Sequence, residues 1–445
     1  MMPRLSALSF RGGLHPLIYA LAAPALLLSQ HAAVAAAYAL VGEPLEPNLQ
    51  FWLLPLRRLA QIAEVTPLAL AGAFAFGLLI ATVLAWLSFR RAVTAGQGYG
   101  VAPLVVVPVL QLAAVLVLLV MPRARRSPDE SPEAERGGAV ILQGVLAGVG
   151  LVVFGVFLSA VVFRAYGSGM FLLTPLLLGF TTAYIANRKT ELTSGRTFGL
   201  VMAALGLSGL ALLALALEGV ICILMAAPLA IGMAMLGSAI GRSLALRNRR
   251  PARPMAMSLA VLPLVFALEA ALPPAVALDT HESIEIAAPP AAVWTALTAT
   301  GDIGPRPGLL FRLGLAYPVR GEMKGEGVGA ERIGVFSTGV ARERITAWAP
   351  GEKLEFVVLS NPPLMDEYSP YPHVHAPHVN GYFETGWTRF DLQPLPGGRT
   401  RLVVSATHTL RLDPVLYWAP MVRWGIDQNN GRVLRHIRAR AETMD

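Results

Sequence analysis

The histidines near the C-terminus are the residues best suited to chemistry. His373, His375 and His378 lie two and three positions apart in the segment YSPYPHVHAPHVNGYFETGW. Imidazoles at this spacing can converge on a metal ion where the chain turns, and His408 can add a further ligand. The alternative is a proline-kinked loop at a cavity mouth, with histidines bonded to backbone carbonyls or to Glu384. We favour this ligand-contacting loop and predict no metal site.

Fewer features of the same region support acid–base catalysis. Asp366, Glu367, Glu384 and His408 are residue types used for cyclisation or dehydration, yet no spacing constrains them to meet. The sequence shows no Ser-His-Asp order and no nucleophile elbow. We therefore predict no catalytic residue, and an enzyme that uses the histidine cluster stays open as an alternative.

Strand alternation predicts where His408 points. It shares a face with apolar neighbours two residues apart, among them Val404, Ala406 and Leu410, so it is expected in a cavity or under a helix. The predicted ligand-contacting residues are His373, His375, His378, Glu384, Trp387 and His408.

The C-terminal third has a pattern of strands and turns. Pro289 and Pro290 open an early helix, and Asp413 followed by Pro414 predicts the N-cap and first residue of a long final helix. This arrangement of a sheet between a short and a long helix is α+β. The predicted strands cover residues 281–287, 330–336, 340–348, 353–359, 382–392 and 400–410.

Four parts of this third carry a family resemblance. The segments SIEIAAPPAAVWTALT, ERITAWAPGEKLEFVV and GGRTRLVVSATHTL, with the final helix, resemble the START/polyketide cyclase-like (SRPBCC, helix-grip) superfamily. The resemblance covers residues 279–445. It implies a curved antiparallel sheet wrapped around the long helix, with an apolar cavity for lipids, sterols, quinones or polyketides. It implies no particular activity.

The rest of the chain has a membrane protein's composition. Hydrophobic residues make up 55% and charged residues 14% of the chain, whereas a soluble domain averages about 25% charged. A bilayer core of roughly 30 Å needs about 20 apolar residues per helix. Stretches of this kind predict an all-α bundle of about eight transmembrane helices, covering residues 17–41, 68–88, 101–121, 139–163, 171–186, 198–217, 219–240 and 255–278.

The predicted domains follow from these patterns. Residues 1–122 form a membrane module of about three helices, 123–138 a charged linker, 139–278 a second module of about five helices, and 279–445 the soluble domain. Residues 85–122 also resemble the end of a family of small bacterial inner-membrane proteins of unknown function. The aspartate expected in their Arg-Arg turn is missing here, so no chemistry is implied.

Three polar residues interrupt the apolar stretches. His31 lies in the first, Glu218 marks a tight turn between two of them, and Glu269 is expected in the middle of the last. Ionisable groups inside a membrane are candidates for function because burying a charge there is costly. A transporter regulated by the soluble domain is therefore a further alternative.

Charge separates the two parts of the chain. Before Asp279 there are 19 Lys and Arg against 10 Asp and Glu, and from Asp279 onward 17 against 18. The positive excess belongs to the membrane part, which argues against a nucleic-acid partner. The single cysteine, Cys222, excludes a disulfide within the chain and a zinc site built from several cysteines. No motif indicates a cofactor.

Basic loops predict the orientation. The arginines between Arg242 and Arg253 favour a cytoplasmic position for that loop, which places the soluble domain outside the cytoplasm of a bacterial inner membrane. Arg90 and Arg91, with the N-terminal arginines, favour the opposite orientation if all eight helices cross. We predict a multi-pass protein that binds, senses or transfers a lipid-, isoprenoid- or polyketide-like molecule, with the bilayer and that molecule as partners.

Overall fold

The chain folds into two compact units, which are described separately. The computed structural model describes residues 14–62, 66–95, 101–106, 108–123, 137–247, 253–304, 308–312, 314–367 and 379–443. Unit 1 consists mainly of Met1–Leu59 and Gly72–Pro273, and unit 2 mainly of Pro274–Tyr368 and Pro377–Asp445. Residues 124–136, most of the predicted linker, lie outside the described residues.

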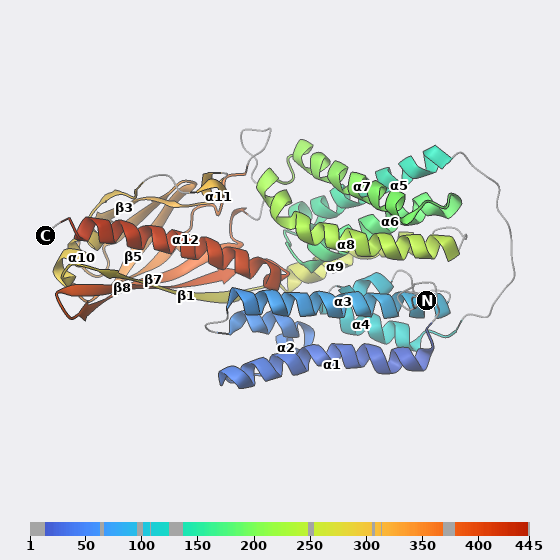
Figure 1. Cartoon of the computed structure of the whole chain (residues 1–445), viewed down its shortest axis with the longest axis horizontal. Helices are drawn as coiled ribbons and strands as arrows, with labels where there is room; N and C mark the ends of the chain where they lie inside the picture. Colours follow the sequence, from blue (N-terminus) through green and yellow to red (C-terminus); the bar gives the residue numbers. More distant parts are fainter. Residues whose placement is uncertain are drawn as a thin grey trace, which may run out of the picture. The chain divides into compact units, whose positions relative to one another are not determined.

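Unit 1 is helical (Figure 1). Its described residues contain six helices that are long and apolar enough to cross a membrane, so the predicted count of about eight is not confirmed. The six spans include all or part of α1 (Pro16–Val41), α3 (Pro67–Ala95), α5 (Gly137–Val156), α6 (Thr174–Lys189), α7 (Ser194–Ala214) and α8 (Val220–Arg247). π-helical segments extend two of them: Phe157–Val162 follows α5 and Gly169–Leu173 precedes α6. Shorter helices are α2 (Leu49–Leu53), α4 (Pro108–Val120) and α9 (Arg253–Ala271).

Prolines explain two of the differences from the predicted spans. Pro108 is the first residue of α4, so the predicted span 101–121 divides into a 3₁₀ helix, Ala102–Val106, and this shorter helix. Pro273 and Pro274 follow α9, and a helix does not continue through such a pair. The predicted span 255–278 was therefore wrong at its end, where Val276 begins a strand.

Hydrogen bonds show that α3 and α4 end at the same end of unit 1. The N–H of Leu14, just before α1, donates to the carbonyl of Arg90 (3.2 Å). Arg91 donates to the carbonyl of Met121, just after α4. The start of α4 lies beside the middle of α1, where Gln30 donates to Gln111 (3.2 Å). α4 therefore covers only part of the bundle's length.

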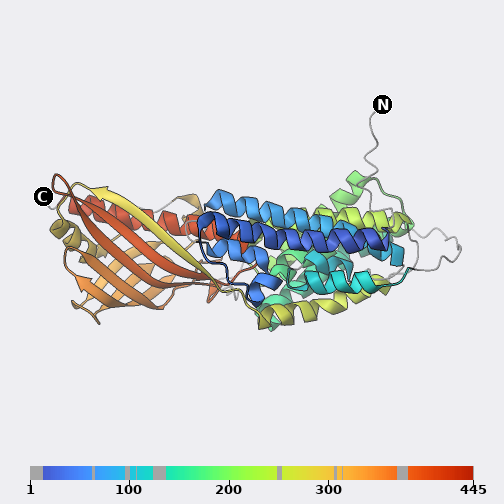
Figure 2. The same ribbon diagram turned by 90° about the horizontal axis from the view of Figure 1, so that it is seen from below.

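We call this the basic end of unit 1. Figures 1 and 2 show that α6 and α8 also end there, while α5, α7 and α9 end at the other end, which we call the acidic end. At the basic end, the described segments carry Arg90, Arg91, Arg123, Arg188, Lys189, Glu191, Arg196, Arg242, Arg247 and Arg253. At the acidic end they carry Glu43, Glu46, Arg57, Arg58, Arg164, Glu218 and Glu269.

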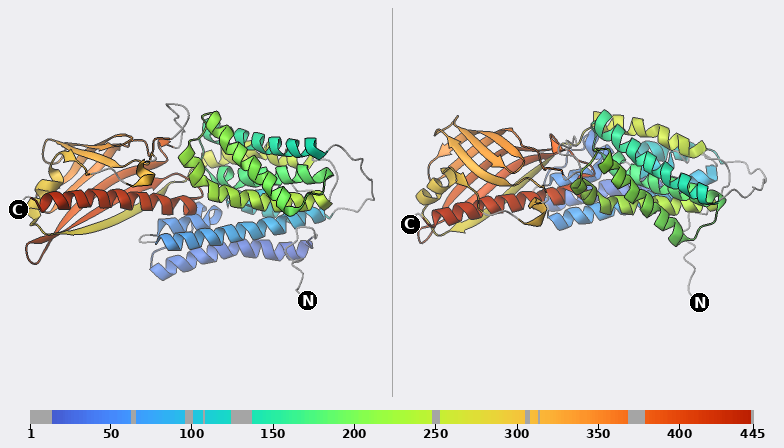
Figure 3. Two further views of the ribbon diagram at one scale, coloured as in Figure 1. Left: turned by 45° about the horizontal axis from the view of Figure 1, so that its top comes forward. Right: turned by 90° about the horizontal axis from the view of Figure 1, so that it is seen from above.

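Unit 2 is one antiparallel sheet with helices. Its eight strands have the order β1-β8-β7-β6-β5-β4-β3-β2. The sheet curls around the long helix α12 (Val415–Ala441), as Figures 2 and 3 show from several sides. The strands are β1 (Val276–Ile286), β2 (Gly301–Asp302), β3 (Pro318–Lys324), β4 (Glu331–Phe336), β5 (Gly339–Ala349), β6 (Lys353–Ser360), β7 (Phe383–Leu395) and β8 (Arg399–Leu410).

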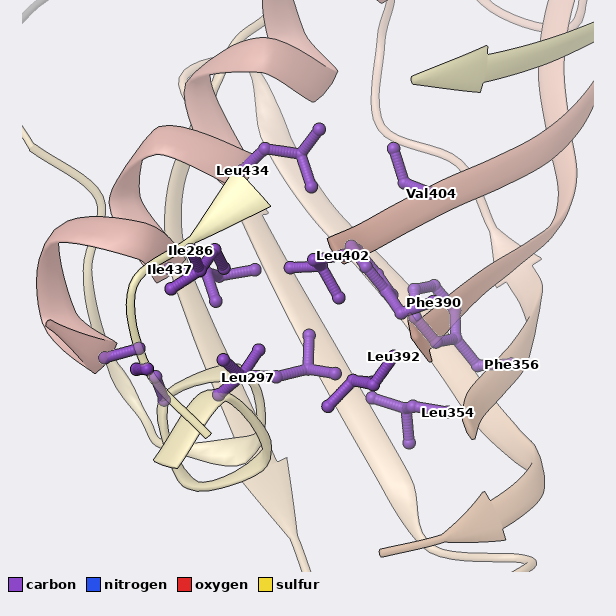
Figure 4. Close-up of a cluster of buried hydrophobic side chains, with 14 of the residues drawn as sticks. Ile286, Leu297, Leu354, Phe356, Phe390, Leu392, Leu402, Val404, Leu434 and Ile437 are labelled. Atoms are coloured by element: carbon purple, nitrogen blue, oxygen red, sulfur yellow. The ribbon is translucent and has the colours of Figure 1, made fainter. Parts of the chain in front are cut away.

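The core of unit 2 lies between the sheet, α12 and the short helix α10 (Pro290–Thr298). Leu402 and Leu354 contribute from the sheet, Leu434 and Ile437 from α12, and Leu297 from α10 (Figure 4). Strand alternation places every second side chain on this inner face, and removing apolar surface from water stabilises the arrangement. The curved sheet around a final helix agrees with the predicted α+β fold.

Smaller elements of unit 2 were missed from the sequence. β2, β3 and the short helix α11 (Leu309–Arg312) have no strong periodic pattern. The predicted cap of the last helix was wrong by one residue. Pro414 is the N-cap, and the carboxylate of Asp413 accepts a hydrogen bond from the N–H of Val415 (3.1 Å).

Candidate functional site

A cavity of about 180 Å³ lies between the curved sheet and α12 in unit 2. Its lining comes from β3 to β8, from α12, from residues 361–364 and from Ile303 and Ala316. Most of the lining is apolar, including Phe336, Ala341, Phe356, Phe390, Val404 and Ile426. Phe356, Phe390 and Val404 belong to the buried cluster in Figure 4, so the cavity is continuous with the hydrophobic core. An apolar cavity of about 150 Å³ is enough to hold benzene.

An ion pair is the strongest polar feature of the wall. Arg332 on β4 and Glu343 on β5 are opposite each other in the sheet and form a salt bridge. Their side chains are 17% and 6% exposed. The Arg332 guanidinium also lies over the ring of Phe356, 4.5 Å from its centre. Both charges are thus held by partners within the wall.

The same pair is electrostatically balanced. Burial raises the pKa of the Glu343 carboxyl, and the Arg332 guanidinium opposes that shift. Gly334 leaves room for the carboxylate, because a Cβ there would lie 3.2 Å from Glu343 Oε1. Protonating Glu343 would leave a buried guanidinium without a counter-charge, which favours the ionised pair.

His408 on β8 is a buried, fully bonded histidine of the wall. It is 5% exposed, and Nε2 and Nδ1 lie 3.3 Å and 3.0 Å from the hydroxyls of Thr280 and Thr385. The ring stacks on Phe383, with 5.2 Å between ring centres. Burial lowers the pKa of His408 to about 4, so the imidazole is neutral at physiological pH.

Two amides of α12 complete the polar part of the lining. Asn429 and Asn430 both line the cavity. Asn429 Nδ2 donates to the carbonyl of Ala316 (3.0 Å), which fixes the orientation of this amide. Asn429 Oδ1 and Asn430 Nδ2 are buried and have no hydrogen-bond partner in the structure. Both atoms are without accessible surface, so they lie behind the cavity surface and do not open into it.

The predicted contact residues are placed differently from one another. His408 lines the cavity. Glu384 and Trp387 on β7 are not among its lining; the Glu384 carboxylate accepts a hydrogen bond from Arg411 (2.6 Å), and Arg389 lies 5.4 Å from the Trp387 ring centre.

The predicted cluster of three histidines is not part of the described structure. His373, His375 and His378 lie outside the described residues. Within the described part of the chain, no three His, Cys, Asp or Glu side chains are grouped closely enough to hold a metal ion.

The polar residues of the membrane part have bonded roles in unit 1. His31 on α1 bonds through Nδ1 to the carbonyl of Leu27 (3.0 Å) and through Nε2 to that of Trp52 (3.2 Å). It also meets the Phe51 ring edge to face, at 5.1 Å. His31 therefore connects α1 to the short helix α2.

Glu218 and Glu269 both bond to the turn between α5 and α6. Tyr166 donates to Glu218 (3.0 Å), and the N–H of Gly169 donates to Glu269 (2.8 Å). Glu218 lies between α7 and α8, as predicted, and is 4% exposed. The expectation that Glu269 is in the middle of a helix was wrong, because α9 ends two residues later at Ala271. Both acids stabilise the turn between α5 and α6.

Sequence reasoning missed the ion pair and the two asparagines. Glu343 had a signal, because it falls between Ala341 and Ile345 on the buried face of a predicted strand. The run Gln428-Asn429-Asn430-Gly431 was a second signal, since Asn and Gly are poor helix formers yet stand within a long helix.

Comparisons with known proteins give the following. No protein-family model matches the sequence, and no curated protein matches it. A solved Mesorhizobium loti protein is 18% identical over 38% of this chain and 99% of its own, with a TM-score of 0.24. A Streptomyces aromatase/cyclase is 16% identical over 37% and 94%, with a TM-score of 0.26.

A norcoclaurine synthase from Thalictrum flavum is 14% identical over 38% of this chain and 97% of its own, also with a TM-score of 0.26. TM-scores this low say nothing about function.

Proposed function

We propose that this protein binds a small, largely apolar molecule in unit 2 and that unit 1 anchors this activity in a membrane. The cavity between the sheet and α12 carries the proposal. Ligand pockets are typically apolar hollows with a few placed polar groups, which is the composition of this lining. The ligand is of the lipid, isoprenoid or polyketide-like kind, and the role is binding, sensing or transfer.

Chain connectivity supports exchange with the bilayer. α9 ends at Ala271 and β1 begins at Val276, so the four residues between them span about 14 Å at most. Val276 pairs with Leu410, and Leu410 pairs with Phe383, which lines the cavity. With the end of α9 at the membrane surface, the end of the sheet that contains Phe383 and His408 is held close to lipid.

Charge supports an orientation. By chain position, the described basic end has nine Lys and Arg and one Glu, whereas the acidic end has three Arg and four Glu. Lys and Arg gather on the cytoplasmic side of membrane proteins. Because α4 does not run the length of the bundle, Arg90 and Arg91 share one end with Arg242, Arg247 and Arg253. We propose that this end is cytoplasmic and that unit 2 lies on the other side of a bacterial inner membrane.

The test is native mass spectrometry of the full chain released from detergent or nanodiscs. The wild type should retain a small molecule or take up the uncharged probe naphthalene. The variant Ala406→Phe fills the cavity from β8 and should do neither, while thermal unfolding checks that it remains folded. Equal retention by both proteins, or by neither, would contradict binding in this cavity.

A further inference from the structure

Exposed apolar side chains gather at one end of unit 2. Four of the five large ones that are exposed in its described residues lie there: Leu309, Val340, Leu359 and Trp424. The fifth, Val328, lies in the turn between β3 and β4 at the opposite end. We call the four the apolar rim. Single exposed apolar residues are ordinary, but a group of them at one end of a domain marks a surface that meets a partner or a membrane.

Strand register places the rim at the end of the sheet where the chain enters it. β1 begins at Val276, opposite the last residue of β8, Leu410. Because each neighbouring pair is antiparallel, β3, β5 and β7 also begin at this end, and β4 and β6 stop there. Val340 is the second residue of β5, and Leu359 is the last but one of β6. Figure 1 shows α11 and the start of α12 at the same end of unit 2, with α10 at the other.

Contacts connect the rim to the wall of the cavity. Phe311 on α11 stacks on Trp424 of α12, with 5.9 Å between ring centres. The hydroxyl of Thr338, in the turn before β5, donates to the carbonyl of Pro363 (2.7 Å). Pro363 lines the cavity. The rim therefore borders one end of the cavity.

The connection to unit 1 selects the bilayer as the partner of the rim. Only four residues separate α9 from β1, and β1 begins at the end of the sheet that carries the rim. With the end of α9 at the membrane surface, the rim is within reach of lipid headgroups. The opposite end of unit 2 has a different surface, because its turns and helix end expose charged side chains: Lys324, Glu326, Glu352, Arg399 and Glu442.

We propose, on the basis of the membrane anchoring proposed above, that the apolar rim enters the headgroup layer of the bilayer that unit 1 crosses. Leu309, Val340 and Leu359 then leave water, and removing their apolar surface from water stabilises the docked state. Trp424 contributes because an indole is favoured at the membrane interface. The cavity wall at Pro363 is then next to lipid, so a ligand passes between bilayer and cavity without crossing water.

The charges beside the rim indicate which lipids suffice. In the described loops at this end, the formal charges nearly cancel, because Arg312 and Arg411 stand against Asp366, Glu367 and Asp413. Attraction to anionic headgroups is therefore weak, and the burial of apolar surface supplies the docking energy. Zwitterionic lipids are then sufficient.

A polarity-sensitive fluorophore on single cysteines tests the docking. In a Cys222→Ser background, Leu309→Cys and Val328→Cys are labelled with NBD in the full chain in phosphatidylcholine nanodiscs. The two positions are matched, because Leu309 is 70% and Val328 69% exposed. We expect the label at Leu309 to emit at shorter wavelength and to lose emission when the lipids carry a nitroxide near the headgroup. The label at Val328 should do neither, and Leu359→Cys should behave like Leu309→Cys.

A label on α1 separates this inference from the proposed anchoring. Leu21 is exposed on α1, so a label at Leu21→Cys should also lose emission with the nitroxide lipids. If it does while the label at Leu309 does not, unit 1 is anchored and the docking of unit 2 is wrong. If no label loses emission, the proposed anchoring itself fails.

Two further results would overturn the docking. A shift to shorter wavelength at Leu309 without quenching by the nitroxide lipids would mean that protein covers the rim, either unit 1 or a second copy of the chain. A shift that appears only after phosphatidylglycerol is added, and is lost in high salt, would show electrostatic attraction instead of apolar insertion. The docking inferred here is expected to be unchanged by both.

Discussion

At the scale of residues, the cavity combines an apolar lining with polar groups that are neutral in sum. Glu343 and Arg332 remain buried because each is the counter-charge of the other. His408 remains buried because it is uncharged. Each of these groups is therefore sensitive to the loss of its partner or to a change in protonation.

His408 makes unit 2 less stable in acid. Its pKa is about 4 in the folded protein, below the ordinary 6.5, because burial disfavours the imidazolium while Asp279 partly opposes the shift. The unfolded chain therefore binds the proton first, and stability falls as pH drops from 6.5 to 4. The total loss is about 3 kcal/mol.

Urea unfolding followed by tryptophan fluorescence at several pH values measures this effect. His408→Gln should remove most of the acid-dependent loss between pH 6.5 and 4. His281→Gln, on the neighbouring strand β1, is the control and should keep it. An unchanged pH dependence in His408→Gln would mean that other groups cause the loss.

The ion pair should behave as a unit. Glu343→Gln leaves the Arg332 guanidinium buried without a counter-charge and should lower the free energy of unfolding by about 3 kcal/mol. The double change Glu343→Leu with Arg332→Met removes both charges and should recover most of that loss. Urea unfolding of the wild type, Glu343→Leu, Arg332→Met and their double variant gives the coupling. Additive losses would show that the two side chains do not depend on each other.

At the scale of elements, α6 and α8 of unit 1 are held in close contact by glycines. A Cβ at Gly179 would lie 1.9 Å from the carbonyl oxygen of Ala234, and one at Gly237 would lie 2.0 Å from that of Leu176. Gly241 is equally tight against Phe180, at 2.3 Å. Small residues let membrane helices approach in this way, and van der Waals contact then stabilises the pair.

A methyl group at this crossing should disrupt the bundle. Gly237→Ala forces the α6 backbone away and should destabilise unit 1 by about 2 kcal/mol or more. Gly232→Ala is the matched control, because it is in the same helix with nothing within 4 Å of its Cβ. Thermal unfolding in detergent measures both. Equal effects of the two changes would mean that α6 and α8 are not packed this closely.

At the scale of the whole molecule, orientation depends on which helices cross the membrane. Arg90, Arg91 and Arg123 join the other six described basic residues at one end of unit 1 because α3 and α4 both end there. The chain continues into β1 from the acidic end. The charge pattern and the connectivity therefore support the same proposal, with unit 2 outside the cytoplasm.

Labelling with a membrane-impermeant maleimide tests this orientation. In a Cys222→Ser background, Glu326→Cys puts a thiol in an exposed turn of unit 2, and Glu191→Cys puts one in the loop between α6 and α7. In cells with a permeabilised outer membrane, the first should be labelled and the second only after lysis. The reverse pattern would place unit 2 in the cytoplasm.

Local patterns in the sequence were enough to predict much of the fold. The six strands predicted from alternation overlap β1 and β4 to β8, and five of them, β4 to β8, agree to within three residues at each end, because one face of each is buried. Stretches of about 20 consecutive apolar residues predicted the helices of unit 1. Both signals depend on neighbours along the chain, so they need no knowledge of distant contacts.

The site depended on tertiary structure. β8 brings His408 between Thr280 of β1 and Thr385 of β7, and α12 brings Asn429 and Asn430 over the same cavity. These groups are more than a hundred residues apart at the extremes, and nothing local to any one of them indicates the others. The sequence by itself determined which residues alternate between core and solvent. Only the folded sheet, by curling around α12, decided which of them face a common cavity, because that depends on packing between elements far apart in the chain.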